Sequence, residues 1–169
     1  MKLVKVFKEN KQFTLFSILA LVVVGVAVFA PQIAPYDPLD AVMLESLQAP
    51  SSAHPFGTDK LGRDLLSRVI FGTRTSLIMT LCLVAVIFVI GTFLGVIAGY
   101  FGGIVDGVIM RIADMMISFP GLVLAIAIAG MLGPNLVNAV ISIAAVSWTK
   151  YARLARSMVL RVKKNLYIE

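Results

Sequence analysis

The stretch TSLIMTLCLVAVIFVIGTFLGVIAGYFGGIV, from Thr75 to Val105, contains no charged residue. A helix needs about 20 predominantly apolar residues to cross the hydrocarbon core of a bilayer, which is roughly 30 Å thick. This stretch exceeds that length. It predicts a transmembrane helix over about Thr75–Ala98, and this helix decides the fold class.

The composition of the whole chain agrees with a membrane protein. Hydrophobic residues make up 59% of the 169 residues and charged residues only 14%, and the mean hydropathy is +0.95. A soluble domain usually has about 25% charged residues. We therefore expect an all-α integral membrane protein in contact with a lipid bilayer.

Three glycines recur at every fourth position near the end of this span. Because of that spacing, Gly91, Gly95 and Gly99 share one face of the helix. A stripe of small residues lets two helix backbones approach closely in lipid. We expect the stripe to pack against another span, with a direct role in lining a transport pathway as the alternative.

An earlier apolar run, FTLFSILALVVVGVAVFAPQIA, covers residues 13–34 and is also long enough to span. A cleaved signal peptide is the alternative, because lysines precede the run. However, the run exceeds the usual apolar region of about 7–15 residues, and Pro31 directly follows the candidate cleavage site. We predict an uncleaved transmembrane helix. The lysines of residues 1–12 then place the N-terminus in the cytoplasm.

Residues 35–74 are rich in Pro, Gly, Ser and Asp and are too polar to span. The topology predicts an extracytoplasmic loop, with which its four basic residues conflict mildly. Apolar residues at helical spacing predict a short amphipathic helix over Leu61–Phe71, with Thr58 or Asp59 as its N-cap. This helix would lie at the membrane surface or pack on the protein itself. The basic residues are Lys60, Arg63, Arg68 and Arg74.

The third apolar run, DGVIMRIADMMISFPGLVLAIAIAGML (106–132), opens with charged residues. Arg111 and Asp114 are three positions apart and are predicted to form an ion pair on one helix face. We expect this pair on the cytoplasmic side, either as an interfacial pair or with a role in gating or subunit contact. Pro120 should kink the span or free a carbonyl for another partner.

The fourth run, from Leu136 to Thr149, follows a predicted turn at GPN (133–135). It spans only if the helix continues through KYARLARSMVL (150–160), with the basic side chains reaching the cytoplasmic interface. Trp148 and Tyr151 suit that interface. The prediction is therefore about four transmembrane helices, with both ends of the chain in the cytoplasm.

Several functions are disfavoured by the residues present. Cys82 is the single cysteine and His54 the single histidine, so neither a disulfide framework nor a metal site is expected. The net charge of +6 gathers at the two ends, which is typical of membrane flanks rather than of a nucleic-acid-binding protein. There is no nucleophile–base pair and no phosphate-binding loop, so we expect no catalytic residue and no cofactor.

Four segments of the chain resemble the C-type permease subunit of the dipeptide, oligopeptide and nickel ABC importers. The resemblance covers essentially the whole chain, and its most specific element is the pattern GTD-x-x-GRD-x-x-SR. In order, the segments are HPFGTDKLGRDLLSRVIFGTRTSL (54–77), GVIAGYFGGIVDGVIMRIADMMISFPGL (95–122), LGPNL (132–136) and SWTKYARLARSMVL (147–160).

The resemblance implies the fold and partners of a binding-protein-dependent (type I) ABC permease. Residues 75–169 would form the N-terminal part of its transmembrane domain. The expected partners are a B-type permease, two ATP-binding subunits and an extracytoplasmic solute-binding protein. The loop 35–74 would contact either the solute-binding protein or the partner permease. ATP hydrolysis would occur in the partners, in a bacterial or archaeal cytoplasmic (inner) membrane. Di- or oligopeptides are the expected substrates, with nickel or a metal chelate as the alternative.

The resemblance also gives Glu169 a role. In this family a motif beginning Glu-Ala-Ala follows the fourth span and docks the ATP-binding subunit, and Glu169 matches its first residue. The chain is thus expected to be the N-terminal part of a longer permease, unable by itself to couple ATP hydrolysis to transport. The alternatives from other classes are a stand-alone membrane scaffold or regulator and a fragment of a secondary transporter; the latter would show inverted repeats, and no internal repeat is present.

Overall fold

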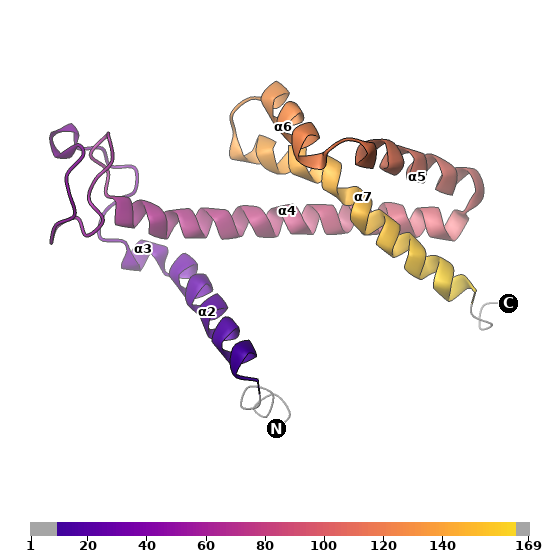
Figure 1. Cartoon of the computed structure of the whole chain (residues 1–169), viewed down its shortest axis with the longest axis horizontal. Coiled ribbons are helices and arrows are strands. Elements are labelled where there is room, and N and C mark those ends of the chain that lie inside the picture. Colours follow the sequence, from indigo (N-terminus) through magenta and orange to yellow (C-terminus); the bar gives the residue numbers. More distant parts are fainter. Residues whose placement is uncertain (1–9, 165–169) are drawn as a thin grey trace. The chain divides into compact units, whose positions relative to one another are not determined.

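The computed structural model describes residues 10–164, and these residues form helices and loops (Figure 1). The chain divides into two compact units, Met1–Ile78 and Met79–Glu169. The helices, in chain order, are α2 (Lys11–Val28), α3 (Ala30–Ile33), the 3-10 turn η1 (Met43–Glu45), α4 (Leu65–Phe101), α5 (Gly103–Ser118), α6 (Gly121–Leu132) and α7 (Leu136–Lys163).

In the first unit, the predicted span over residues 13–34 is divided into α2 and α3. The division falls at Phe29, whose amide donates to the carbonyl of Gly25. Two residues later, Pro31 has no amide hydrogen, and its ring would clash with the carbonyl of Ala27 in a continuous helix. The proline that argued against signal cleavage therefore also ends the long helix.

The predicted amphipathic helix over Leu61–Phe71 is wrong at its start. Gly62 has φ +73°, a left-handed conformation that interrupts a helix, and a Cβ atom there would overlap the carbonyl of Val42. The helix instead begins at Leu65, and Asp64 caps it by accepting a hydrogen bond from the Ser67 amide at 2.7 Å. The expected caps, Thr58 and Asp59, lie in the preceding loop.

The helix that starts at Leu65 is α4, and it continues without a break to Phe101, over 37 residues. At 1.5 Å per residue it is about 55 Å long, well beyond the thickness of a hydrocarbon core. The short amphipathic helix and the span Thr75–Ala98, which were predicted as two separate helices, are therefore parts of one helix. Both α2 and α4 are long and apolar enough to cross a membrane.

In the second unit, α5 and α6 meet at a 92° bend (Figure 1). The third run is therefore more sharply broken than a kink: α5 ends at Ser118, and Pro120 precedes the first residue of α6. The two helices provide a third span only if the bent pair is counted as one. α7 is long enough to cross a membrane, but its polar and basic residues make it less apolar than α2 and α4, and it is not a candidate span by length and hydropathy. The fourth span therefore stays a prediction.

Candidate functional site

The glycine stripe of α4 lies against α7. A Cβ atom added at Gly91 would lie 2.6 Å from the Cβ atom of Tyr151, and one added at Gly99 would lie 2.8 Å from that of Val159. At Gly95 the added atom would overlap the carbonyl of Ala152. Even a methyl group therefore does not fit at these positions unless α7 moves, so the contact requires glycine. We call this contact the glycine seam.

Two alanines of α7 lie at the glycine seam. Ala152 is fully buried, and the Cβ atom of Ala155 would lie 2.8 Å from one added at Gly95. Tyr151, expected as an interfacial anchor, packs its ring edge-on to Phe88 of α4 with centroids 6.2 Å apart. Shape complementarity here is between backbones rather than between large side chains.

Two ion pairs join α5 to α7. The guanidinium of Arg156 binds the carboxylate of Asp106 through two parallel hydrogen bonds, each 2.5 Å long. This forked geometry is the strongest that an arginine and a carboxylate form. Further along, Arg153 pairs with Asp114. The two pairs follow an antiparallel order, because the chain position increases along α5 while it decreases along α7.

Asp114 thus has a different partner from the one predicted, which was Arg111. The reason lies in which face of α5 contacts α7: Ala113 is fully buried there, whereas Arg111 is exposed. Spacing within one helix indicated a local pair but gave no information on a neighbouring helix. The whole of α6 separates the acids of α5 from the arginines of α7 in the sequence, so no local spacing links the real partners.

The end of α4 is also bound by α7. The ammonium of Lys163 donates to the carbonyl of Tyr100 at 2.7 Å and lies 5.7 Å from the centre of that ring. Carbonyls in the last turn of a helix lack partners within the helix, and a lysine there also interacts favourably with the helix dipole. Arg153, Arg156 and Lys163 therefore bind α5 and α4 from the second half of α7.

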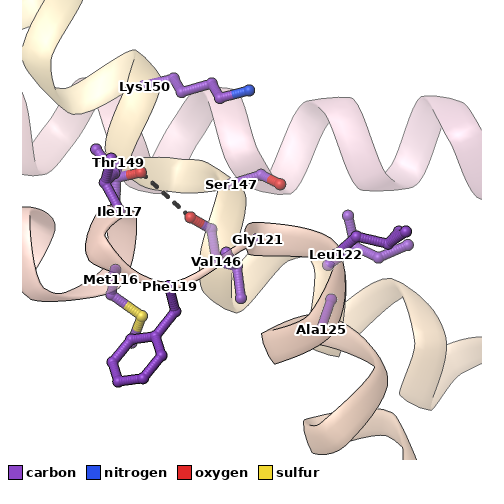
Figure 2. A pocket seen from close by; sticks show the side chains of 11 residues that line it. Met116, Ile117, Phe119, Gly121, Leu122, Ala125, Val146, Ser147, Thr149 and Lys150 are labelled. Atoms are coloured by element: carbon purple, nitrogen blue, oxygen red, sulfur yellow. Dashed lines mark hydrogen bonds between the residues drawn. The ribbon is translucent and has the colours of Figure 1, made fainter.

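A cleft of about 310 Å³ lies where α5 breaks into α6 (Figure 2). Apolar side chains from both sides of Pro120 face α7 across the cleft. A Cβ atom added at Gly121 would lie 3.5 Å from a methyl carbon of Val146, so the chain passes close to α7 here. Lys150 is the one ionisable residue in its lining. The full lining is Met116, Ile117, Phe119, Gly121, Leu122, Ala125, Ile143, Val146, Ser147, Thr149 and Lys150. Such a surface suits packing or passage rather than acid–base chemistry.

In the first unit, Asp59 gathers two of the loop's basic residues. Arg63 Nη2 lies 2.8 Å from its carboxylate, and Arg68 also pairs with it. Burial raises the pKa of Asp59, but hydrogen bonds from Arg63 and from the Leu61 amide, with the charge of Arg63, lower it well below its usual range. The carboxylate of Asp59 therefore holds Arg63 and Arg68 against the loop.

Across the described residues, His, Cys, Asp and Glu do not gather in a group of three able to hold a metal ion. Cys82 is exposed on α4. Glu169, predicted to open the ATPase-docking loop, lies outside the described residues, as do residues 1–9.

Comparison with known proteins places both ends of the chain in related families. Residues 2–50 match the N-terminal transmembrane domain of oligopeptide transport permease C. Residues 91–169 match the binding-protein-dependent transport system inner membrane component. The chain belongs to the C-type permease family of binding-protein-dependent transporters. This confirms the resemblance found in the sequence and the all-α membrane fold of that family.

Individual C-type permeases are similar over most of this chain. The probable D,D-dipeptide transport system permease protein DdpC of Escherichia coli K12 is 40% identical over 168 residues, which is 99% of this chain and 56% of that protein. The glutathione transport system permease protein GsiD of Pectobacterium atrosepticum is 42% identical over 150 residues, or 88% of this chain and 50% of that protein. The nickel transport system permease protein NikC of E. coli K12 is 38% identical over 134 residues, 79% and 48% respectively. The chain thus spans about half the length of these permeases.

Proposed function

We propose that this chain acts as a transmembrane permease subunit of an ATP-driven importer of di- or oligopeptides. Its likeness to the D,D-dipeptide permease over 99% of its length is the observation that favours this function. The helix contacts also suit a transport subunit, because α4, α5 and α7 meet through small residues and ion pairs and provide no arrangement for bond chemistry.

We further propose that it works with a B-type permease, two ATP-binding subunits and an extracytoplasmic solute-binding protein. The family description, which names binding-protein-dependent transport, supports the last of these partners. In this arrangement the N-terminus and the arginines of α7 face the cytoplasm, where Glu169 contacts an ATP-binding subunit. The loop 35–74 faces outward. The lysines of residues 1–12 support this orientation through the positive-inside rule.

Nickel is the second candidate substrate, favoured by the 38% identity to the nickel permease NikC. The described part of the chain gives no metal-binding cluster that would mark nickel as its cargo. In either case the glycine seam and the Asp106–Arg156 and Asp114–Arg153 pairs hold the helices together, and the cleft beside Pro120 adjoins them.

Two chimaeras test these proposals without depending on where this chain begins or ends. In one, this chain replaces the matching region of DdpC; in the other, it replaces the matching region of NikC. Each is expressed in cells that lack the native permease but retain its partner subunits, and uptake of labelled D,D-dipeptide or of nickel is measured. We expect dipeptide uptake well above the empty-vector level.

The two chimaeras distinguish the candidates. Uptake of nickel alone would replace the peptide assignment with the nickel one. Uptake in both systems would retain the permease function and assign substrate choice to the partners. If both chimaeras reach the membrane, as a blot of the membrane fraction shows, and neither supports uptake, the permease function itself is refuted.

A further inference from the structure

The loop of the first unit contains the only histidine of the chain, His54. It is 6% exposed, although it lies in a polar loop. Its ring stacks at a 32° tilt on that of Tyr36, with centroids 4.9 Å apart. A buried histidine needs partners for its ring nitrogens, so these partners define what it does.

Both ring nitrogens of His54 face a carboxylate, and the two carboxylates come from different elements. Nδ1 lies 3.0 Å from Asp64 Oδ1, at the N-terminus of α4. Nε2 lies 3.4 Å from Glu45 Oε2, in η1. His54 therefore stands between the η1 turn and the first turn of α4.

Asp64 is an ionised and fixed partner. Its second oxygen accepts hydrogen bonds from the amide and the hydroxyl of Ser67, both at 2.7 Å. Burial raises the pKa of Asp64, but the hydrogen bonds from Ser67 and His54 outweigh it and lower that pKa below its usual value. Because an ionised carboxylate only accepts hydrogen bonds, Nδ1 must hold the hydrogen of the neutral ring.

The other nitrogen then behaves differently in the two charge states of the ring. In neutral His54, the lone pair of Nε2 faces the carboxylate of Glu45, and two acceptors oppose each other. In protonated His54, Nε2 gains a hydrogen and both nitrogens donate to carboxylates. We propose that His54 is a proton-dependent latch, which fastens η1 to the N-terminus of α4 when its ring is protonated.

The segment that the latch fastens is also held by hydrogen bonds to residues 58–60, among them one from the Thr58 hydroxyl to the carbonyl of Glu45 and one from the Ser46 hydroxyl to the carbonyl of Lys60 at 2.9 Å. The amide of Leu47 donates to the carbonyl of Asp59 at 3.0 Å, and the amide of Gln48 donates to the hydroxyl of Thr58 at 2.8 Å. Next to Glu45, the side chains of Met43 and Leu44 are 69% and 97% exposed. Closing the latch thus holds an apolar tip of the loop in one position.

The groups that face His54 are few. Glu45 comes from η1, Asp64 from the start of α4 and Tyr36 from the segment after α3, while the amide of His54 itself donates to the Ser51 hydroxyl. The nearby cations Arg63 and Arg68 are paired with Asp59. No cation among these neighbours opposes protonation of the ring.

The direction of the pH effect follows from these pairs. Only the protonated ring donates from both nitrogens, so acidification closes the latch. Asp64, with its lowered pKa, contributes stability above the unfolded carboxyl pKa of about 3.9 and loses it as the pH falls further. Strong acid therefore opens the latch again.

The test uses the whole chain in lipid nanodiscs with ¹⁵N-labelled histidine, which gives one imidazole. The ring shifts should show Nδ1–H in the neutral form. Hydrogen–deuterium exchange of the peptide covering residues 43–48, corrected for the intrinsic pH dependence, should slow about two- to five-fold from pH 8 to pH 5, the size expected for a partly exposed ion pair.

Two variants separate the latch from general effects of acid. Glu45→Gln should abolish the extra protection at low pH, because the uncharged amide can donate to Nε2 of the neutral ring and accept from Nε2–H of the protonated one, so it no longer favours the protonated ring. Asp40→Asn, an exposed acid of the same loop, should respond as the unmodified chain does. Hydrogen on Nε2 in the neutral ring, equal protection at the two pH values, or an undiminished response in Glu45→Gln would each overturn the proposal.

Discussion

Residue size decides the contact between α4 and α7. Glycines recur throughout the chain, but only some meet another helix: an added Cβ atom at Gly95 overlaps α7, whereas one at Gly130 in α6 has nothing within 4 Å. The spacing of the stripe was visible in the sequence because period four defines a helix face. The identity of the partner helix was not, because it depends on contacts between distant segments.

Substitution of glycine by alanine therefore has opposite effects at two positions. Gly95→Ala should destabilise the protein by about 1–3 kcal/mol, the usual cost of overpacking. Gly130→Ala should be neutral or stabilise it by about 0.4–1 kcal/mol, since alanine restricts the unfolded chain and has space. Unfolding by sodium dodecyl sulfate in mixed micelles, followed by circular dichroism, measures both. Equal effects would show that helix propensity, not the seam, determines the result.

At the scale of the element, breaks fall where a residue cannot continue a helix. Gly62, in a left-handed conformation, delays the start of α4, and Pro31 and Pro120 lie at breaks of apolar runs. Pro120 was predicted to kink its span, but not how sharply, because the sequence does not show how far a chain bends at a break. Pro31 was considered only as an obstacle to signal cleavage, and the break beside it was not predicted. The sequence likewise gave no sign that the amphipathic pattern after Leu61 and the next span form one helix.

The bend at Pro120 provides a test of this view. Pro120→Ala restores an amide that donates to the carbonyl of residue 116, so α5 and α6 should become more nearly collinear. Spin labels at the exposed positions Val108 and Ile126 should move apart, as measured by double electron–electron resonance. Pro134→Ala, in the turn before α7, is the control and should leave the distance unchanged. An unchanged distance in Pro120→Ala would instead assign the bend to packing against α7.

At the scale of the whole molecule, hydropathy was sufficient for the membrane class and the family resemblance for the transport class. Both α2 and α4 meet the requirements of a span. The pairing of Asp106 and Asp114 with arginines of α7 was beyond sequence reasoning, because the charges are separated by long apolar segments. Folding places the acids of α5 beside the arginines of α7, although they are far apart in the sequence.

The predicted topology is tested with single cysteines in a Cys82→Ala background. Ser52 and Arg161 are exposed positions, one in the loop 35–74 and one near the end of α7. A membrane-impermeant maleimide added to intact cells should label Ser52→Cys and not Arg161→Cys, and the pattern should reverse in inside-out vesicles. Labelling of both positions from the same side would contradict the predicted number of crossings.

The glycine seam also affects how α4 and α7 slide past each other. Where side chains interlock, helices shear only when many rotamers change together, but glycine has no rotamer to change. Small axial displacements along Gly91, Gly95 and Gly99 therefore meet a smooth surface. The hydrogen bond from Lys163 to the carbonyl of Tyr100 then limits how far α7 moves along α4. Shear of this helix pair is opposed by that bond and by the ring contact of Tyr151 with Phe88 rather than by repacking of a core.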